Sequence, residues 1–265
     1  MSAPSDSPAA RLQVRLRRLT WREPFRWLSL GWRDFLRAPF MGLFFGSCFM
    51  VMGWALLKVY EAAPAYLLAL AAGFLLVGPV LFLGLYRISQ VLERGERPDF
   101  GDALLAFESR IGPLALFGLV LLVLEMIWGR ASLVIFAVSF DGMPDFKGSI
   151  TALLNPENLS FIVAYIAVGG VFAGLIYAVS AVSIPMLLDQ PVDAVTAALT
   201  SLKLVLAQPG VMLCWGACIA LLVGLAMLPW FVGLPLVAPV IGHASWHAYR
   251  AAVQVDAVAA DAAPT

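Results

Sequence analysis

Few residues of this chain have side chains that could carry chemistry, and their apolar surroundings single them out. Glu125 and Arg130 lie five residues apart in a long apolar stretch, with Glu125 near its middle. If the stretch crosses a membrane, a charge there costs about 2.5–3.5 kcal/mol, so such residues face other helices and are often functional. We predict that Glu125 is a proton or cation site. The alternatives are a protonated carboxyl bonded to a neighbouring helix and a pair with Arg130, which we expect to reach the membrane surface.

His243 and His247 are the only histidines, and their i, i+4 spacing places both on one face of a helix. This spacing suits a metal site, but no third ligand is near in sequence, so we predict no metal. We expect them to anchor the end of a span, with a proton relay to Glu125 as an alternative. Cys48, Cys214 and Cys218 lie in apolar stretches and are expected to be small core residues.

The composition predicts that these residues are positioned by membrane-spanning helices. Of the 265 residues, 62% are hydrophobic and 13% charged, whereas soluble domains have about 25% charged residues. The apolar residues form blocks near 20 residues long, which match a hydrocarbon core of about 30 Å. We therefore predict an all-α polytopic membrane protein with six spans, at about 39–57, 64–85, 113–138, 159–188, 210–228 and 231–249. The alternative for the third span is an end near Gly129.

Three amphipathic helices precede the odd-numbered spans, at residues 24–37, 99–110 and 189–208. Each leads into a proline that opens a span: Pro39, Pro113 and Pro209. We predict three units, each an amphipathic helix followed by a hairpin of two spans, around an axis normal to the membrane. The alternative is that proline and tryptophan simply mark membrane interfaces.

Prolines and glycines inside the spans predict kinks and close packing. A proline removes a backbone hydrogen bond, so helix kinks are predicted at Pro79, Pro235 and Pro239. Small residues let helices approach closely. We expect such contacts at Gly42, Gly46, Gly73, Gly78, Gly169, Gly170, Gly174 and Gly216; the Gly170-x-x-x-Gly174 pair could instead serve a dimer.

The basic residues predict the orientation. With six spans, the segments on the side of the termini hold 14 of the 17 lysines and arginines. The positive-inside rule then places both termini in the cytoplasm. The expected organisation is a disordered, Arg-rich segment at 1–23, a membrane domain at 24–252 and a loose tail at 253–265.

Three stretches together resemble a known family. They are WLSLGWRDFLRAP from Trp27, GPVLFLGLYRISQVLERGERP from Gly78 and PVIGHASWHAYR from Pro239. They are similar to uncharacterised bacterial inner-membrane proteins grouped as domain of unknown function 2189. The resemblance extends over about residues 24–252 and implies a multi-span protein of the bacterial inner membrane with no assigned activity. Some members of this family have been labelled as similar to cytochrome c oxidase subunit I, which binds haem and copper. Two histidines are too few for such a centre, so no cofactor is expected.

Two functions fit these observations. The first is a small transport or permeation protein, with Glu125 in its path beside the kinked helices, because transport sites lie near the midplane at broken helices. The second is a non-catalytic scaffold or assembly factor that binds lipid or a protein partner through its amphipathic helices; a homo-oligomer is included. No P-loop, zincin, nucleophile elbow or dinucleotide fingerprint occurs, so we predict neither an enzyme nor a nucleic-acid partner.

Overall fold

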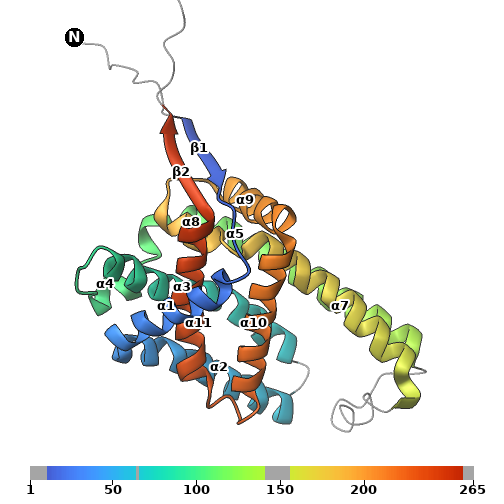
Figure 1. The fold of residues 1–265 in the computed structure, drawn as a ribbon. Coiled ribbons are helices and arrows are strands. Elements are labelled where there is room, and N and C mark those ends of the chain that lie inside the picture. Colours follow the sequence, from blue (N-terminus) through green and yellow to red (C-terminus); the bar gives the residue numbers. More distant parts are fainter. Residues whose placement is uncertain (1–10, 64–65, 141–155, 259–265) are drawn as a thin grey trace, which may run out of the picture.

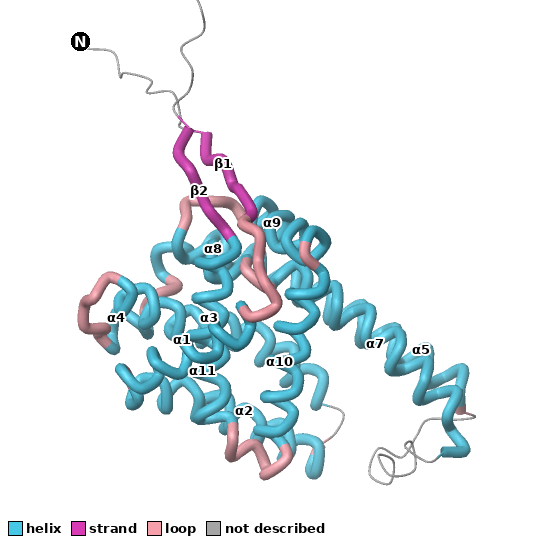
Figure 2. The backbone as a smooth tube through the Cα atoms, in the orientation of Figure 1, coloured by secondary structure: helices cyan, strands magenta, loops and turns pink. Residues whose placement is uncertain are grey.

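A computed structural model describes residues 11–63, 66–140 and 156–258, and it is helical apart from one pair of strands (Figures 1 and 2). Four of its helical segments are long and apolar enough to cross a membrane: Pro39–Ala62, Ile111–Ser139, Pro156–Asp189 and Pro209–Met227. The chain is therefore an all-α polytopic membrane protein. The predicted count of six spans and their arrangement in three units go beyond this finding.

The first and last predicted units begin with the same backbone geometry. Helix α1 (Glu23–Arg37) meets α2 (Pro39–Ala62) at Ala38, where φ is −136° and ψ is 55°. Helix α9 (Ala194–Ala207) meets α10 (Pro209–Met227) at Gln208, with φ −136° and ψ 56°. In both cases a proline occupies the first turn of the second helix, where its missing N–H costs nothing.

The middle predicted unit departs from this pattern. The helix expected at 99–110 is two short pieces, α4 (Phe100–Leu104) and η2 (Glu108–Arg110). The next helix, α5 (Ile111–Ser139), starts two residues before Pro113 and continues past Gly129 without a break. It pairs with α7 (Leu159–Ser180), which follows η3 (Pro156–Asn158). This hairpin projects from the rest of the molecule in Figure 1.

Helix α11 (Leu234–Ala252) is the centre of the remaining helices and packs against α1, α2, α3 (Leu67–Glu93) and α10. Two glycines make this packing close. A Cβ at Gly31 would lie 2.5 Å from the carbonyl oxygen of Val240, and one at Gly46 would lie 2.4 Å from that of Pro235. Any other residue at these positions would push α1 or α2 away from α11.

The glycine predictions hold at some positions and not at others. Side chains from neighbouring elements also meet Gly42, Gly169 and Gly216. By contrast, no atom outside its own segment lies within 4 Å of a Cβ placed at Gly73, Gly170 or Gly174 in the described structure. The expectation that Gly170 and Gly174 pack inside the chain is therefore wrong, because their face of α7 is open.

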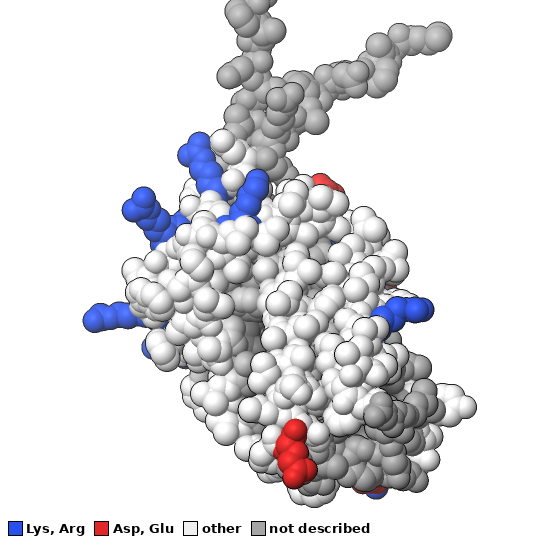
Figure 3. Space-filling model, turned by 90° about the vertical axis from the view of Figure 1, so that its right-hand side faces the viewer, with Lys and Arg blue, Asp and Glu red and all other residues white. Residues whose placement is uncertain are grey.

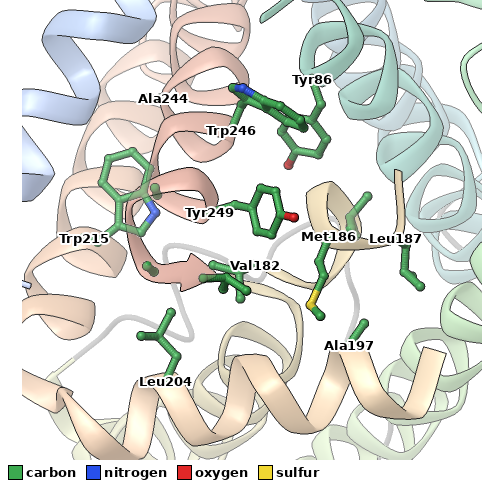
Figure 4. Close-up of a cluster of buried hydrophobic side chains, with 14 of the residues drawn as sticks. Tyr86, Val182, Met186, Leu187, Ala197, Leu204, Trp215, Ala244, Trp246 and Tyr249 are labelled. Atoms are coloured by element: carbon green, nitrogen blue, oxygen red, sulfur yellow. The ribbon is translucent and has the colours of Figure 1, made fainter. Parts of the chain in front are cut away.

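The largest buried core lies at one end of the molecule, where α8 (Ser183–Asp189) and α9 meet α10 and α11. Figure 4 shows Trp215, Trp246, Tyr249, Met186 and Leu204 converging there. Capping fixes the start of α9, because the Asp193 carboxylate accepts the backbone N–H groups of Val195 and Thr196, each at 2.9 Å.

The two ends of the described chain pair with each other, which the sequence did not predict. Strand β1 (Arg11–Leu16) is antiparallel to β2 (Val253–Val258), with Leu16 opposite Val253. The expectations of a disordered segment at 1–23 and a loose tail at 253–265 are therefore wrong for these strands; residues 1–10 and 259–265 lie outside the described structure. The N-terminal segment is also tied to the α9–α10 junction, since Gln208 accepts from Leu19 N at 2.6 Å and donates to Arg17 O at 2.8 Å.

Candidate functional site

Polar side chains are concentrated on the C-terminal half of α11 and on the helix faces that meet it. Residues 243, 246, 247, 249 and 250 supply two histidines, a tryptophan, a tyrosine and an arginine. Their partners come from α1, α3 and α8. We call this group the polar cluster: Asp34, Ser89, Gln90, Glu93, Asp189, His243, Trp246, His247, Tyr249 and Arg250.

Asp34 joins α1 to α11 through a buried contact with His247. The Asp34 Oδ2 and His247 Nε2 atoms are 2.8 Å apart, and their side chains are 6% and 16% exposed. Burial alone would raise the pKa of Asp34, but the hydrogen bond and charge of His247 and a hydrogen bond from Ser89 together hold it below its usual 3.8. The carboxylate is thus kept ionised by its partners.

Ser89 extends this contact to the second histidine. Its Oγ lies 2.8 Å from Nδ1 of His243, and both side chains are fully buried. His243 Nε2 has no hydrogen-bond partner among the described residues. The four side chains form a chain of contacts from half-buried His247 through Asp34 and Ser89 to His243. His247 therefore contacts a carboxylate, and His243 contacts a hydroxyl.

Glu93, at the end of α3, holds the next turn of α11. Its Oε2 accepts the Trp246 Nε1–H at 3.0 Å, and its Oε1 accepts the Arg250 Nε–H at 3.2 Å. Trp246 is fully buried, so the hydrogen bond satisfies an indole N–H that would otherwise be costly to bury.

Asp189, the last residue of α8, is the most heavily bonded carboxylate of the cluster. Its Oδ1 accepts from Gln90 Nε2 at 2.9 Å. Its Oδ2 accepts from the Tyr249 hydroxyl and from Gln190 Nε2, both at 2.8 Å, and lies 3.5 Å from Arg250 Nη1. With this saturation Asp189 serves as a fixed joint between α3, α8 and α11.

A cleft of about 720 Å³ lies beside the polar cluster, between α3, α4 and α8. Arg87 of α3 crosses it to Asp102 of α4, with both Nε and Nη2 at 2.9 Å from Oδ2. The cleft shares Gln90 and Asp189 with the polar cluster. Its lining residues are Arg87, Gln90, Arg94, Gly101, Asp102, Leu105, Ala106, Glu108, Leu188 and Asp189.

The residues predicted from the sequence do not come together. Glu125 lies half-buried on α5, Arg130 is exposed on the same helix, and no hydrogen bond or ion pair links them in the described structure. Neither residue lines the cleft or contacts the histidines. In the described chain no group of three metal-ligating side chains occurs, and the histidines are paired with other partners.

The predicted kink prolines occupy different positions. Pro79 lies inside α3 and Pro239 inside α11. Pro235 instead lies in the first turn of α11, where a proline needs no N–H partner and does not interrupt the helix. The kink predicted there is therefore wrong.

Sequence reasoning missed most of the cluster. The charge of Asp34 favours an outward position, but Trp27, Gly31 and Asp34 share the face of α1 that is buried against α11. The position of Gly31 between Trp27 and Asp34 on one helix face was the available signal that this face packs closely against another helix. Ser89 and Glu93, four residues apart at the end of a span, give a similar signal on α3.

Comparison with known families agrees with this architecture. A family model described as "Predicted integral membrane protein (DUF2189)" matches residues 67–189. Residues 67–189 are thus similar to this family, and we call them the DUF2189 segment. The DUF2189 segment contains every residue that lines the cleft, whereas Asp34 and the α11 residues of the polar cluster lie outside it. The stretches at Trp27 and Pro239 that resemble the family also fall outside the match. No curated protein and no solved structure matches the chain.

Proposed function

We propose that the protein is a non-catalytic scaffold or assembly factor of the bacterial inner membrane. The observation that supports this best is the use of its polar groups: carboxylates of three helices, of which that of Asp34 is buried, bind their helices to α11. Asp34, Glu93 and Asp189 each accept bonds from α11. In this proposal the polar cluster keeps the helices in a fixed arrangement, and the outer faces of the helices bind lipid or a protein partner.

The outer faces of α1 and α9 fit this role because each helix has a second apolar stripe that points outward. On α1, the exposed Phe25, Trp32 and Leu36 lie between arginines. On α9, Leu199 and Leu206 are 49% and 70% exposed, while the opposite face is buried. Apolar stripes flanked by basic residues suit a membrane surface or the interface with a partner helix.

The test is photo-cross-linking in cells, with a photoreactive amino acid at Leu199 or Leu206 and, as control, at buried Ala197. A protein band of the same fixed mass from both outer positions, and not from the control, is the expected result. Cross-links to lipid alone would reduce these faces to membrane anchors and overturn the assembly role.

We also propose the full topology: six spans in three units, with both termini in the cytoplasm. The repeated geometry at Ala38 and Gln208 supports the units, and α3 and α11 supply the two further crossings. Figure 3 shows a largely uncharged face whose basic side chains gather toward the end that carries the strands. A membrane-impermeant thiol reagent on intact spheroplasts should label Lys58→Cys and leave Arg250→Cys unlabelled, in a background without native cysteines. The reverse result would invert the orientation.

Transport remains the second candidate because of one observation, the half-buried Glu125 in an apolar helix with no partner in the described structure. Proton and potassium flux into vesicles containing the purified protein tests it. Flux above that of empty vesicles, lost in Glu125→Gln and kept in Glu157→Gln, would favour transport over the scaffold. The scaffold proposal expects no flux from either protein.

A further inference from the structure

The cleft between α3, α4 and α8 has charged walls at the level where the apolar helices end. Its basic residues are Arg87 and Arg94, and its acidic residues are Asp102, Glu108 and Asp189. At about 720 Å³ it is within the usual range of small-molecule sites, about 300–1,000 Å³. The question is which of these charges remain available to a ligand.

Three of the five charged groups are already committed to partners within the protein. Arg87 and Asp102 pair with each other, with N···O distances of 2.9 Å. Asp189 accepts bonds on both oxygens from Gln90 and Tyr249. Because these three groups are paired within the protein, none of them offers a free charge to a ligand.

Arg94 and Glu108 are different, because both line the cleft and neither has a hydrogen bond or ion pair in the described structure. Arg94 is the C-cap residue of α3, and Glu108 begins η2, which follows α4 in the chain. The cleft therefore offers one free guanidinium and one free carboxylate. A purely anionic ligand would meet the Glu108 carboxylate, and a purely cationic one would meet Arg94.

Apolar side chains border the same opening. Leu105 and Leu188 line the cleft, and Leu105 is 49% exposed. Leu104 and Ile111, which are close to Leu105 in sequence, are 42% and 61% exposed. Ile111 begins α5, which is a candidate membrane span, so this border lies where the chain enters the membrane. A ligand in the cleft would thus have its polar part among charges and could place apolar chains on these residues.

We propose that the cleft binds a zwitterionic aminophospholipid, with its phosphate on Arg94, its ammonium on Glu108 and its acyl chains along Leu105 and Ile111. Arginine presents several N–H donors to phosphate oxygens, and a carboxylate accepts from a primary ammonium. This proposal goes beyond the scaffold role and does not depend on it, because lipid binding is measured on the purified protein without any partner or flux.

The experiment measures the melting temperature of the purified protein in detergent as lipid is added. The probes are a short-chain phosphatidylethanolamine, a phosphatidylglycerol of the same chains and free phosphoethanolamine. We expect phosphatidylethanolamine to raise the melting temperature by several degrees in a saturable manner, because a ligand that binds only the folded state stabilises it. Phosphatidylglycerol and free phosphoethanolamine should give much smaller shifts.

Two variants and a matched control locate the effect. Arg94→Gln and Glu108→Gln should each weaken the apparent affinity for phosphatidylethanolamine about tenfold or more, since each removes a charge-assisted contact. Arg97→Gln removes an arginine three residues from Arg94 that does not line the cleft, and it should bind like the parent. Since all three side chains are exposed, the melting temperatures without lipid should agree.

Three outcomes would overturn the proposal. An equal shift with phosphatidylglycerol would show that the charges do not select the headgroup. An equal shift with free phosphoethanolamine would assign the cleft to a soluble ligand. Equal losses in Arg97→Gln and Arg94→Gln would place lipid binding outside the cleft.

Discussion

Two regions of this protein solve the problem of holding helices together in opposite ways. Around α11, hydrogen bonds that involve Asp34, Ser89, Glu93 and Asp189 join four helices, with the carboxylates as acceptors, and glycines bring helix backbones into contact. No ion pair lies within the described residues of the α5–α7 hairpin, and its two helices are joined by contacts between aromatic rings, such as Trp128 with Tyr165, whose ring centroids are 5.1 Å apart. Few residues of this hairpin are fully buried, and many of its apolar side chains, such as Val134 and Ile166, are exposed.

The contrast between the two regions indicates which contacts determine how the helices are arranged. In lipid, apolar side chains gain little by leaving the solvent, so polar bonds and close backbone packing must decide which helices meet. The α11 region has both polar bonds and close backbone packing. The hairpin helices are joined to each other by ring contacts, and a hydrogen bond from the Tyr177 hydroxyl to Met212 O at 2.6 Å ties α7 to α10. Helices α3, α8 and α9 also contact the hairpin.

The strongest way to break this contrast is to remove Asp34. Asp34→Ala leaves His247 and Ser89 without their shared acceptor, and breaking a buried pair costs about 3–5 kcal/mol. We expect a loss of about 3 kcal/mol in the free energy of unfolding, measured by denaturant titration in detergent micelles. Asp102→Ala is the control: it removes a pair with Arg87 that is 29% and 49% exposed, and should cost under about 1 kcal/mol. Equal losses would show that burial of the polar cluster adds nothing.

Close packing gives the next largest effect. In Gly46→Ala, the new Cβ would lie 2.4 Å from the Pro235 carbonyl oxygen, so α2 must move from α11, at a cost of about 1–3 kcal/mol. Gly170→Ala on α7 meets no atom within 4 Å and should gain up to about 1 kcal/mol, because alanine favours helix. Both are read from unfolding in the same detergent. A loss at Gly170 comparable with that at Gly46 would show that α7 has a close partner, such as a second copy of the chain.

These two predictions also show how far the sequence leads. The prolines at 39 and 209 located helix starts to the residue, and the apolar blocks located the long helices, because both are local signals. The role of Gly46 was predicted, whereas Gly170 has the same sequence pattern and no neighbour. A glycine in the sequence indicates only that another helix can approach closely. Whether a helix does so, and which one, depends on contacts between residues far apart in sequence.

The site was harder to predict for the same reason. His243 and His247 were found because their spacing is local, but their partners come from helices about 150–210 residues away in sequence. Asp34 gave no local signal of its burial, because a charged side chain in an amphipathic helix usually faces water. Strands β1 and β2 lie at opposite ends of the chain, so their pairing left no local signal either.

Protonation of the Asp34 carboxylate in acid should lower the stability of the protein, by less than its removal in Asp34→Ala. Its pKa is lower in the folded protein than its usual 3.8, so the folded state binds protons less readily than the unfolded state. The stability it contributes is present above about pH 4 and is lost as the pH falls through its folded pKa. The melting-temperature gap between the parent and Asp34→Asn should therefore be constant from pH 6 to pH 5 and narrow below pH 4. A gap independent of pH down to pH 3 would contradict this assignment.

A ring contact in the hairpin should matter locally and little elsewhere. Trp128→Ala removes the rings' contact with Tyr165 and Phe172 and opens space beside Gly169. Such ring pairs contribute about 0.5–1.5 kcal/mol. Hydrogen exchange should rise in α5 and α7 while the amides of α11 keep their protection. Increased exchange in α11 would show that the hairpin and the α11 region unfold as one unit.

The smallest effect is expected at Glu125, which tests the hairpin's polar content directly. Glu125→Gln keeps the shape of the side chain and removes its titrating group. With no partner to lose in the described structure, the variant should melt within a degree or two of the parent, or above it if the carboxyl is a tolerated cost. Arg130→Gln, an exposed position on the same helix, controls for loss of charge. A fall of several degrees in Glu125→Gln alone would mean that the carboxyl forms a structural bond, and the hairpin would then share the polar means of assembly that mark the α11 region.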